Sequence, residues 1–346
     1  MIKEIVILIV WVDRTEPTIG GLQKRISEIS FAVARAGYKV VIVTLEGSHS
    51  SENPFVEKVD SLETGYQVIA SLVDKSPNCV IYVGRLISPE TEHVRQLALL
   101  AKLGATILVR AQSTRAAEIL SLPRCSRLLA PCVTSIHALN QESAKLLRMA
   151  YAETQVKLIP NPFPRNLFVG GWPRDSYAMF AGRIVPSKNL HSLIYAWRLL
   201  SCSKTQLRIY GISDDVSYYE YCKKLTKDCE SIKWYHPYKP NNFTPLSRAR
   251  FLVVPSLREG HSNLVSEAMS VGTFILGSRV SGIAEHINNG RGMCVEPSSG
   301  DIFKGLRAVS VMQDDELMRC ASAAKSYADQ HTTDLQLLDL LRQLRT

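Results

Sequence analysis

Two glutamates, Glu259 and Glu267, have the spacing that most directly suggests chemistry. They lie in the segment FLVVPSLREGHSNLVSEAM, residues 251–269. Carboxylates suit hydroxyl groups, from which they accept hydrogen bonds. For either glutamate taken alone, a capping arrangement or a solvated helix face is the favoured interpretation. The whole segment favours a binding site, because an apolar run, a polar loop and a helix start follow one another.

The helix start within this segment predicts an anion site. The apolar run ends at Pro255, and Ser262 and Asn263 are both residue types favoured at helix N-caps. Amide groups at a helix N-terminus and the helix dipole attract negative charge. We therefore expect a diphosphate to bind at Ser262, Asn263 and Leu264, with a glutamate on each side of it.

A second segment, FAGRIVPSKNL (residues 180–190), supplies positive charge. An apolar run ends at Gly182, Arg183 follows, and Lys188 comes five residues later. A guanidinium offers a planar set of donors and an ammonium a mobile point charge, so together they can clamp two phosphate groups. Each cation alone also fits an ordinary surface position.

The run EGHSNLVSE resembles the Glu–seven residues–Glu signature of family 4 retaining glycosyltransferases of the GT-B fold. The resemblance implies that Glu259 contacts donor-sugar hydroxyls and that Glu267 binds the ribose. The loop and helix residues that it implies for the diphosphate are Gly260, His261, Ser262, Asn263 and Leu264.

The same resemblance gives Gly182, Arg183 and Lys188 a role in donor binding. The two cations would stabilise charge on the leaving nucleotide, which is electrostatic catalysis. They would take over the task of a divalent metal, so we expect no metal and no cofactor besides the nucleotide-sugar substrate. Family frequency favours UDP as the nucleotide and leaves GDP open.

Weaker segments add further candidates for donor binding. Gly20 and Gly21, in TIGGL (residues 18–22), match the family's glycine-rich loop. Tyr235 and His236, in IKWYHPY, fall where the family approaches the nucleobase.

One departure from the family concerns a histidine that many members carry in the N-terminal lobe. The matching residues 109–115 read VRAQSTR, without a histidine. Gln112 and Ser113 are candidates for its place, and His137 is expected to be structural.

These segments belong to a chain of alternating strands and helices, which indicates parallel sheets. The sequence predicts an α/β protein of the GT-B type, with two doubly wound, Rossmann-like lobes facing each other across a cleft. Expected strands cover residues 4–12, 38–45, 79–84, 105–110, 156–159, 177–182, 206–211, 231–235, 251–255, 273–277 and 292–296. Expected helices cover residues 22–36, 90–103, 140–150, 188–200, 215–229, 263–271 and 333–346.

Residues 160–175, with four prolines and two glycines, predict a linker between the lobes. We expect an acceptor-binding lobe over 1–165 and a donor-binding lobe over 166–330. The resemblance suggests that the last helix, within 331–346, packs back on the N-terminal lobe.

Composition limits the partners and the compartment. The net charge of +9 is spread over both halves, so it does not form a basic tail. We expect no nucleic-acid partner. Residues 102–148 carry seven Lys and Arg against two Glu, which suits an acidic acceptor or an anionic membrane face as well as a solvated surface. The eight cysteines form no CxxC pair and indicate reduced thiols. The expected location is cytoplasmic, with peripheral contact at the inner membrane face left open.

The sequence thus predicts a retaining, metal-independent glycosyltransferase. It would move a sugar from a nucleotide diphosphate to an unidentified hydroxyl acceptor, in cell-surface polysaccharide, glycolipid or natural-product glycoside synthesis. A non-catalytic nucleotide-sugar-binding protein and a GT-B epimerase or phosphorylase are the alternatives. A Rossmann dehydrogenase is disfavoured, because no GxGxxG run follows a predicted strand.

Overall fold

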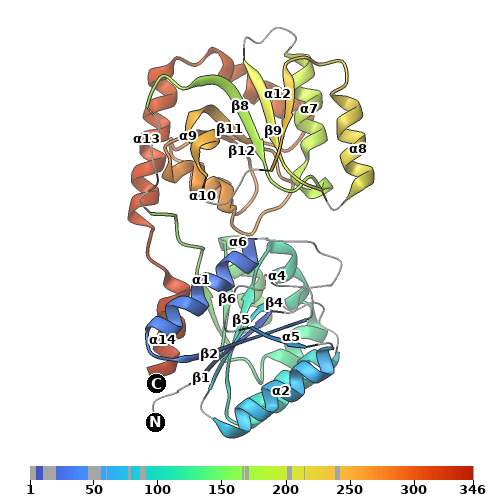
Figure 1. The fold of residues 1–346 in the computed structure, drawn as a ribbon, viewed down its shortest axis with the longest axis vertical. Helices are drawn as coiled ribbons and strands as arrows, with labels where there is room; N and C mark the ends of the chain where they lie inside the picture. Colours follow the sequence, from blue (N-terminus) through green and yellow to red (C-terminus); the bar gives the residue numbers. More distant parts are fainter. Residues whose placement is uncertain are drawn as a thin grey trace. The chain divides into compact units, whose positions relative to one another are not determined.

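A computed structural model of the protein shows two compact units, described here one at a time (Figure 1). One unit comprises residues 1–161 and 334–346, and the other comprises residues 162–333. The boundary therefore falls at Asn161, slightly before the expected position at 165. The structure describes residues 5–10, 21–45, 56–59, 61–76, 79–85, 91–165, 167, 171–200, 205–213, 215–237 and 242–345.

The first unit is built on a parallel sheet with the strand order β3-β2-β1-β4-β5-β6-β7 among the described residues. Its strands are β1 (Ile5–Val10), β2 (Lys39–Leu45), β3 (Val56–Val59), β4 (Val80–Arg85), β5 (Thr106–Ala111), β6 (Ser135–Ala138) and β7 (Gln155–Leu158). Its helices are α1 (Gly21–Arg35), α2 (Leu62–Lys75), α3 (Thr91–Lys102), α4 (Thr114–Leu120), α5 (Pro123–Leu129), α6 (Gln141–Ala150) and α14 (Leu335–Arg345).

Apolar strands in this unit are buried on both faces. In β4, Ile81 and Val83 face one core, whereas Val80 and Tyr82 face a second core shared with α1 and α14. Continuous apolar runs are typical of such strands, because helices cover both sides of a parallel sheet. The parallel topology expected from the sequence is therefore confirmed.

The last helix, α14, packs within the first unit against α1 and β4. Leu340 lies in the core there, and Asp339 Oδ2 is hydrogen-bonded to His137 Nε2 at 2.8 Å. Lys157 is the second partner of Asp339. His137 is fully buried, and burial lowers its pKa. The structural role expected for His137 is confirmed by these contacts.

The second unit repeats the architecture with the strand order β10-β9-β8-β11-β12-β13 among the described residues. Its strands are β8 (Asp175–Ala181), β9 (Gln206–Tyr210), β10 (Ile232–Tyr235), β11 (Ala249–Val254), β12 (Phe274–Ser278) and β13 (Met293–Val295). Its helices are the 3₁₀ turn Pro186–Lys188, α7 (Leu190–Leu199), α8 (Val216–Leu225), α9 (Thr244–Arg248), α10 (Asn263–Ser270), α11 (Ala284–Ile287), α12 (Ser299–Val311) and α13 (Asp314–Gln330).

Helices cover both faces of this second sheet (Figure 1). One core joins the sheet to α7, α8 and α12, and the other joins it to α9, α10 and α13. In the described part of the chain, no helix is long and apolar enough to cross a membrane.

Candidate active site

The second sheet reverses its strand order between β8 and β11, which pair with each other in parallel. In doubly wound sheets, ligands bind beyond the carboxyl ends of the strands at such a switch point. The segment with Arg183 and Lys188 follows β8, and the segment with Glu259 follows β11. The topology thus brings together the two segments that the sequence predicted to bind a diphosphate.

The loop after β8 turns sharply and is tied to the end of β9. Gly182 has a φ of +140°, and its amide donates to the Tyr210 carbonyl oxygen (3.0 Å). Gly211 lies so close that a Cβ atom built on it would stand 2.4 Å from the Gly182 carbonyl oxygen. Arg183 follows and is exposed, and its side chain has no ion-pair partner among the described residues.

Asn189 joins the loop after β8 to the loop after β11, and sequence reasoning did not single it out. It is buried in the left-handed conformation, with a φ of +57°. Its Nδ2 donates to the carbonyl oxygens of Pro255 (3.0 Å) and Pro297 (2.8 Å). The Leu257 amide also donates to the Ser187 carbonyl oxygen (2.9 Å). The asparagine directly after Lys188 could have indicated a left-handed turn at this point, since asparagine is one of the few non-glycine residues that tolerate positive φ.

Lys188 and Glu259 form an ion pair at the meeting point of these loops. Lys188 Nζ donates to Glu259 Oε1, and Ser256 Oγ donates to the same oxygen at 2.9 Å. The two side chains are largely covered, with 26% of Lys188 and 11% of Glu259 exposed. The predicted phosphate-binding cation and sugar-binding carboxylate are therefore neighbours.

The N-terminus of α10 begins where the sequence predicted. Ser262 is the N-cap, and its Oγ accepts from the Val265 amide at 3.4 Å. Its own amide donates to the Gly282 carbonyl oxygen at 3.3 Å, so that donor is already used. The diphosphate site expected at Ser262, Asn263 and Leu264 stays a prediction. Glu267 lies one turn further along α10 and is half-buried.

The His261 side chain does not face a ligand-binding surface, as the expected role in diphosphate binding would suggest, because its ring is buried in the interior. It is 7% exposed, and its Nε2 lies 2.8 Å from Ser266 Oγ. Gly260, directly before it, is also buried. Gly282, with a φ of +81°, packs beneath this loop, and a Cβ atom built there would stand 2.5 Å from the Gly260 carbonyl oxygen.

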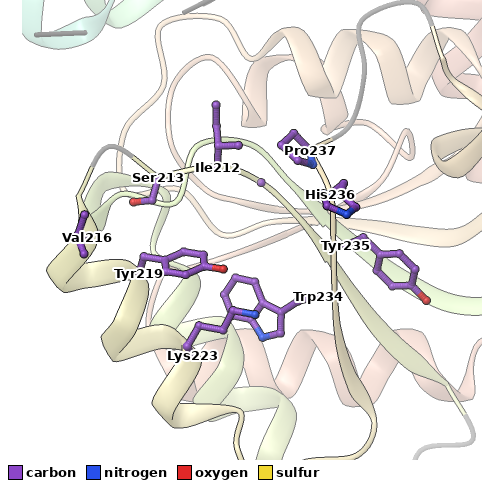
Figure 2. A pocket seen from close by; sticks show the side chains of 10 residues that line it. Ile212, Ser213, Val216, Tyr219, Lys223, Trp234, Tyr235, His236 and Pro237 are labelled. Atoms are coloured by element: carbon purple, nitrogen blue, oxygen red, sulfur yellow. The ribbon is translucent and has the colours of Figure 1, made fainter. Parts of the chain in front are cut away.

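A pocket of about 560 Å³ opens beyond the ends of β9 and β10 (Figure 2). Tyr235 and His236 border it, as expected for nucleobase candidates. The ring of Tyr235, however, stacks on Tyr210, with 4.9 Å between centroids. The Trp234 side chain points away from that of Tyr235, towards Tyr219 and Lys223 (Figure 2). The residues that line the pocket are Gly211, Ile212, Ser213, Val216, Tyr219, Lys223, Trp234, Tyr235, His236 and Pro237.

The candidates in the first unit are only partly described. Gly20 lies outside the described residues, and Gly21 is the first residue of α1. Ser113 caps α4 by accepting from the Ala116 amide at 3.1 Å. Gln112 Oε1 is buried without a hydrogen-bond partner in the described part of the chain.

Metal ligands do not gather in the part of the chain that the structure describes: no three His, Cys, Asp or Glu side chains there could hold a metal ion together. Metal independence itself stays a prediction.

Comparison with known proteins supports the architecture, and a family match covers the segments after β8 and β11 in the second unit. Residues 175–309 match the family described as glycosyl transferases group 1. The chain is also 28% identical, over 160 residues, to O-antigen chain mannosyltransferase B of Escherichia coli. That match covers 43% of this chain and 40% of the relative's length.

Solved structures share the fold over nearly the whole chain at low identity. HepE of Anabaena, in complex with UDP and glucose, is 13% identical with a TM-score of 0.77, and the match covers 98% of both chains. Sucrose-phosphate synthase of Thermosynechococcus elongatus is 17% identical with a TM-score of 0.77, covering 99% of both. The protein has the GT-B fold. In that fold and in its second unit, it resembles family 4 glycosyltransferases.

Proposed function

We propose that the protein is a glycosyltransferase that binds a nucleotide diphosphate sugar in its second unit. One observation carries the proposal: the loops after β8 and β11 meet at the switch point and hold Lys188, Glu259 and the start of α10 together. The group 1 glycosyltransferase match over residues 175–309 includes all of these residues.

The proposed reaction retains the configuration at the anomeric carbon. An acceptor hydroxyl attacks that carbon from the face on which the diphosphate leaves. The new C–O bond forms as the bond to the phosphate oxygen breaks, and the leaving phosphate takes the hydroxyl proton. Arg183 and Lys188 stabilise the charge on the leaving group, in place of a divalent metal. Glu259 positions the sugar.

The rest of the donor extends along the carboxyl edge of the sheet in this proposal. The diphosphate lies at the first turn of α10, and Glu267 accepts from the ribose hydroxyls. The base enters the pocket beyond β9 and β10, whose volume of about 560 Å³ lies within the usual range for small-molecule sites. UDP is the first nucleotide to test. HepE was solved with UDP, whereas the curated relative is a mannosyltransferase, so GDP belongs in the same test.

The acceptor is proposed to be held at an anionic membrane surface. Helices α3 and α5 lie side by side in the first unit. Lys102 on α3 and Arg124 and Arg127 on α5 are exposed cations. The exposed leucines near these cations in the chain are Leu99, Leu103, Leu122 and Leu128. Cations interleaved with apolar side chains suit an anionic lipid surface. Co-sedimentation with phosphatidylglycerol but not phosphatidylcholine vesicles, reduced in an R124E/R127E variant, is the expected result.

The donor proposal is tested by calorimetry with UDP, GDP and ADP in EDTA, on the natural protein and on Glu267→Ala. Selective binding of one nucleotide, weakened in the variant, supports it and names the base. Binding of none of the three would overturn the donor-site assignment. Turnover of the matching sugar nucleotide with acceptor then separates an enzyme from a binding protein.

A further inference from the structure

A chain of hydrogen bonds through two buried histidines lies beneath the loop between Glu259 and α10. Ser266 Oγ donates to the Ser262 carbonyl oxygen at 3.3 Å. His261 Nε2 lies 2.8 Å from Ser266 Oγ, and His286 Nε2 lies 3.1 Å from His261 Nδ1. His286 comes from α11, so the chain joins that helix to α10.

One assignment of the hydrogens makes every link in this chain. Because the Ser266 hydroxyl hydrogen is used on Ser262, its oxygen accepts from His261 Nε2–H. The other nitrogen of a neutral His261 is then an acceptor, and it takes the Nε2–H of His286. All three links are therefore made when both rings are neutral. A side chain without a donor at position 286 would leave His261 Nδ1 without this partner.

The surroundings hold the rings in this arrangement. Burial is the main cause that lowers the pKa of His286 to about 4, and Arg291 and His331 contribute to the same shift. Phe163 packs edge-on against both rings, at 5.9 Å from His261 and 5.5 Å from His286 between centroids. The contacts with Phe163 thereby hold both ring planes.

Gly282 also holds the loop. Its carbonyl oxygen accepts from the Ser262 amide, and its bare Cα packs against the Glu259 and Gly260 carbonyl groups. The peptide groups between Glu259 and Ser262 are thus set by the glycine and by the histidine chain together.

We infer that His261 and His286 are positioning residues for the diphosphate: they orient the Gly260–Ser262 peptide groups and the start of α10, without touching the donor. This inference rests on the proposed donor site. It predicts that damage to the chain weakens recognition of the diphosphate and leaves recognition of the base unchanged.

The test compares His286→Leu, which removes the N–H donor, with His286→Gln, whose amide can place an N–H near the position of Nε2. Ser266→Ala breaks the other end of the chain. His137→Leu is the matched control, since His137 is also buried and hydrogen-bonded but lies in the first unit. Affinity for UDP is measured by calorimetry and affinity for uridine by ligand-observed NMR.

We expect His286→Leu and Ser266→Ala to lose about tenfold in UDP affinity, equivalent to the loss of one well-placed charge-assisted contact. Uridine affinity should stay within about twofold in both, which a general loss of folding would not allow. His286→Gln and His137→Leu should bind UDP like the natural protein. If His286→Leu fails to fold, Ser266→Ala and His286→Gln still decide the matter.

Equal UDP affinity in the natural protein, His286→Leu and Ser266→Ala would overturn the inference while leaving the donor site intact. A parallel loss of UDP and uridine affinity would overturn it too, because the histidines would then support the unit as a whole. Failure of the natural protein to bind any nucleoside diphosphate would instead reject the proposed function.

Discussion

Lys188 and Glu259 are 71 positions apart in the chain, yet the Lys188 ammonium donates a hydrogen bond to Glu259 Oε1. The pair joins the loops that follow two neighbouring strands, β8 and β11. A diphosphate bound at α10 would compete with Glu259 for the ammonium group. In the proposed donor site, the ion pair holds the ammonium group in place beforehand, and the diphosphate replaces Glu259 as its partner.

Lys188→Ala should weaken UDP binding by about tenfold, because a charge-assisted contact to phosphate is lost. Calorimetry in EDTA measures this directly. Lys304→Ala is the control, since Lys304 is an exposed lysine on α12 that pairs only with nearby Asp301 in the described contacts. Unchanged UDP affinity in Lys188→Ala would remove Lys188 from the site.

Asn189→Ala should destabilise the second unit by about 2 kcal/mol, since the carbonyl oxygens of Pro255 and Pro297 lose their donor and a non-glycine residue keeps a positive φ. Asn189→Gly should recover the part of the loss that is due to the backbone. Thermal unfolding of both variants separates the two contributions. Equal stabilities of the Ala and Gly variants would show that the left-handed backbone contributes nothing measurable.

Gly282→Ala should lower the free energy of unfolding by about 2 kcal/mol or more, and it should also weaken UDP binding. The added Cβ would stand 2.5 Å from the Gly260 carbonyl oxygen and 2.8 Å from that of Glu259, at a φ of +81°. Gly300→Ala is the matched control, because a Cβ there meets nothing within 4 Å and lies in a helix. Urea unfolding with and without UDP measures both effects, and a fully tolerated Gly282→Ala would contradict the described loop packing.

The architecture could be predicted from the sequence because local patterns indicate most of its strands and helices. Continuous apolar runs marked most of the strands, and Asn140 and Ser262 cap α6 and α10 as their residue types suggested. Strands β3 (VEKV) and β6 (SIHA) were not predicted, because neither forms a continuous apolar run.

Pairings between distant residues could not be predicted in the same way. Nothing in the local sequence indicates that Lys188 meets Glu259, that Asn189 reaches Pro297, or that the His261 ring turns inward to meet His286. These contacts depend on the strand order of the sheet. The resemblance supplied the identity of site residues, whereas the structure shows how they are held.

The stability of the second unit should fall as the pH drops from about 6.5 towards 4. The unfolded chain binds a proton at His286 near pH 6.5, but in the folded protein burial, Arg291 and His331 lower the pKa of His286 to about 4. Between these values the unfolded state binds more protons, so acid favours unfolding. The full effect is on the order of 3 kcal/mol. His286→Gln should flatten this part of the stability profile, measured by thermal unfolding from pH 7.5 to 4.5. An unchanged acid slope in His286→Gln would contradict the prediction.

Trp234→Ala should weaken binding of uridine and UDP by about tenfold but leave binding of inorganic pyrophosphate unchanged. Trp234 forms one wall of the pocket beyond β10, where its ring meets Tyr219 edge-on at 5.5 Å and Lys223 Nζ lies 4.4 Å above it. Trp234 Nε1 donates to Thr226 Oγ1 at 2.9 Å, which fixes the indole for a base to pack against. Tyr221→Ala, an exposed aromatic on α8 outside the pocket lining, is the control. If Trp234→Ala weakens pyrophosphate and uridine equally, the indole supports the unit instead of the base, and the nucleobase must be sought elsewhere along the carboxyl edge of the sheet.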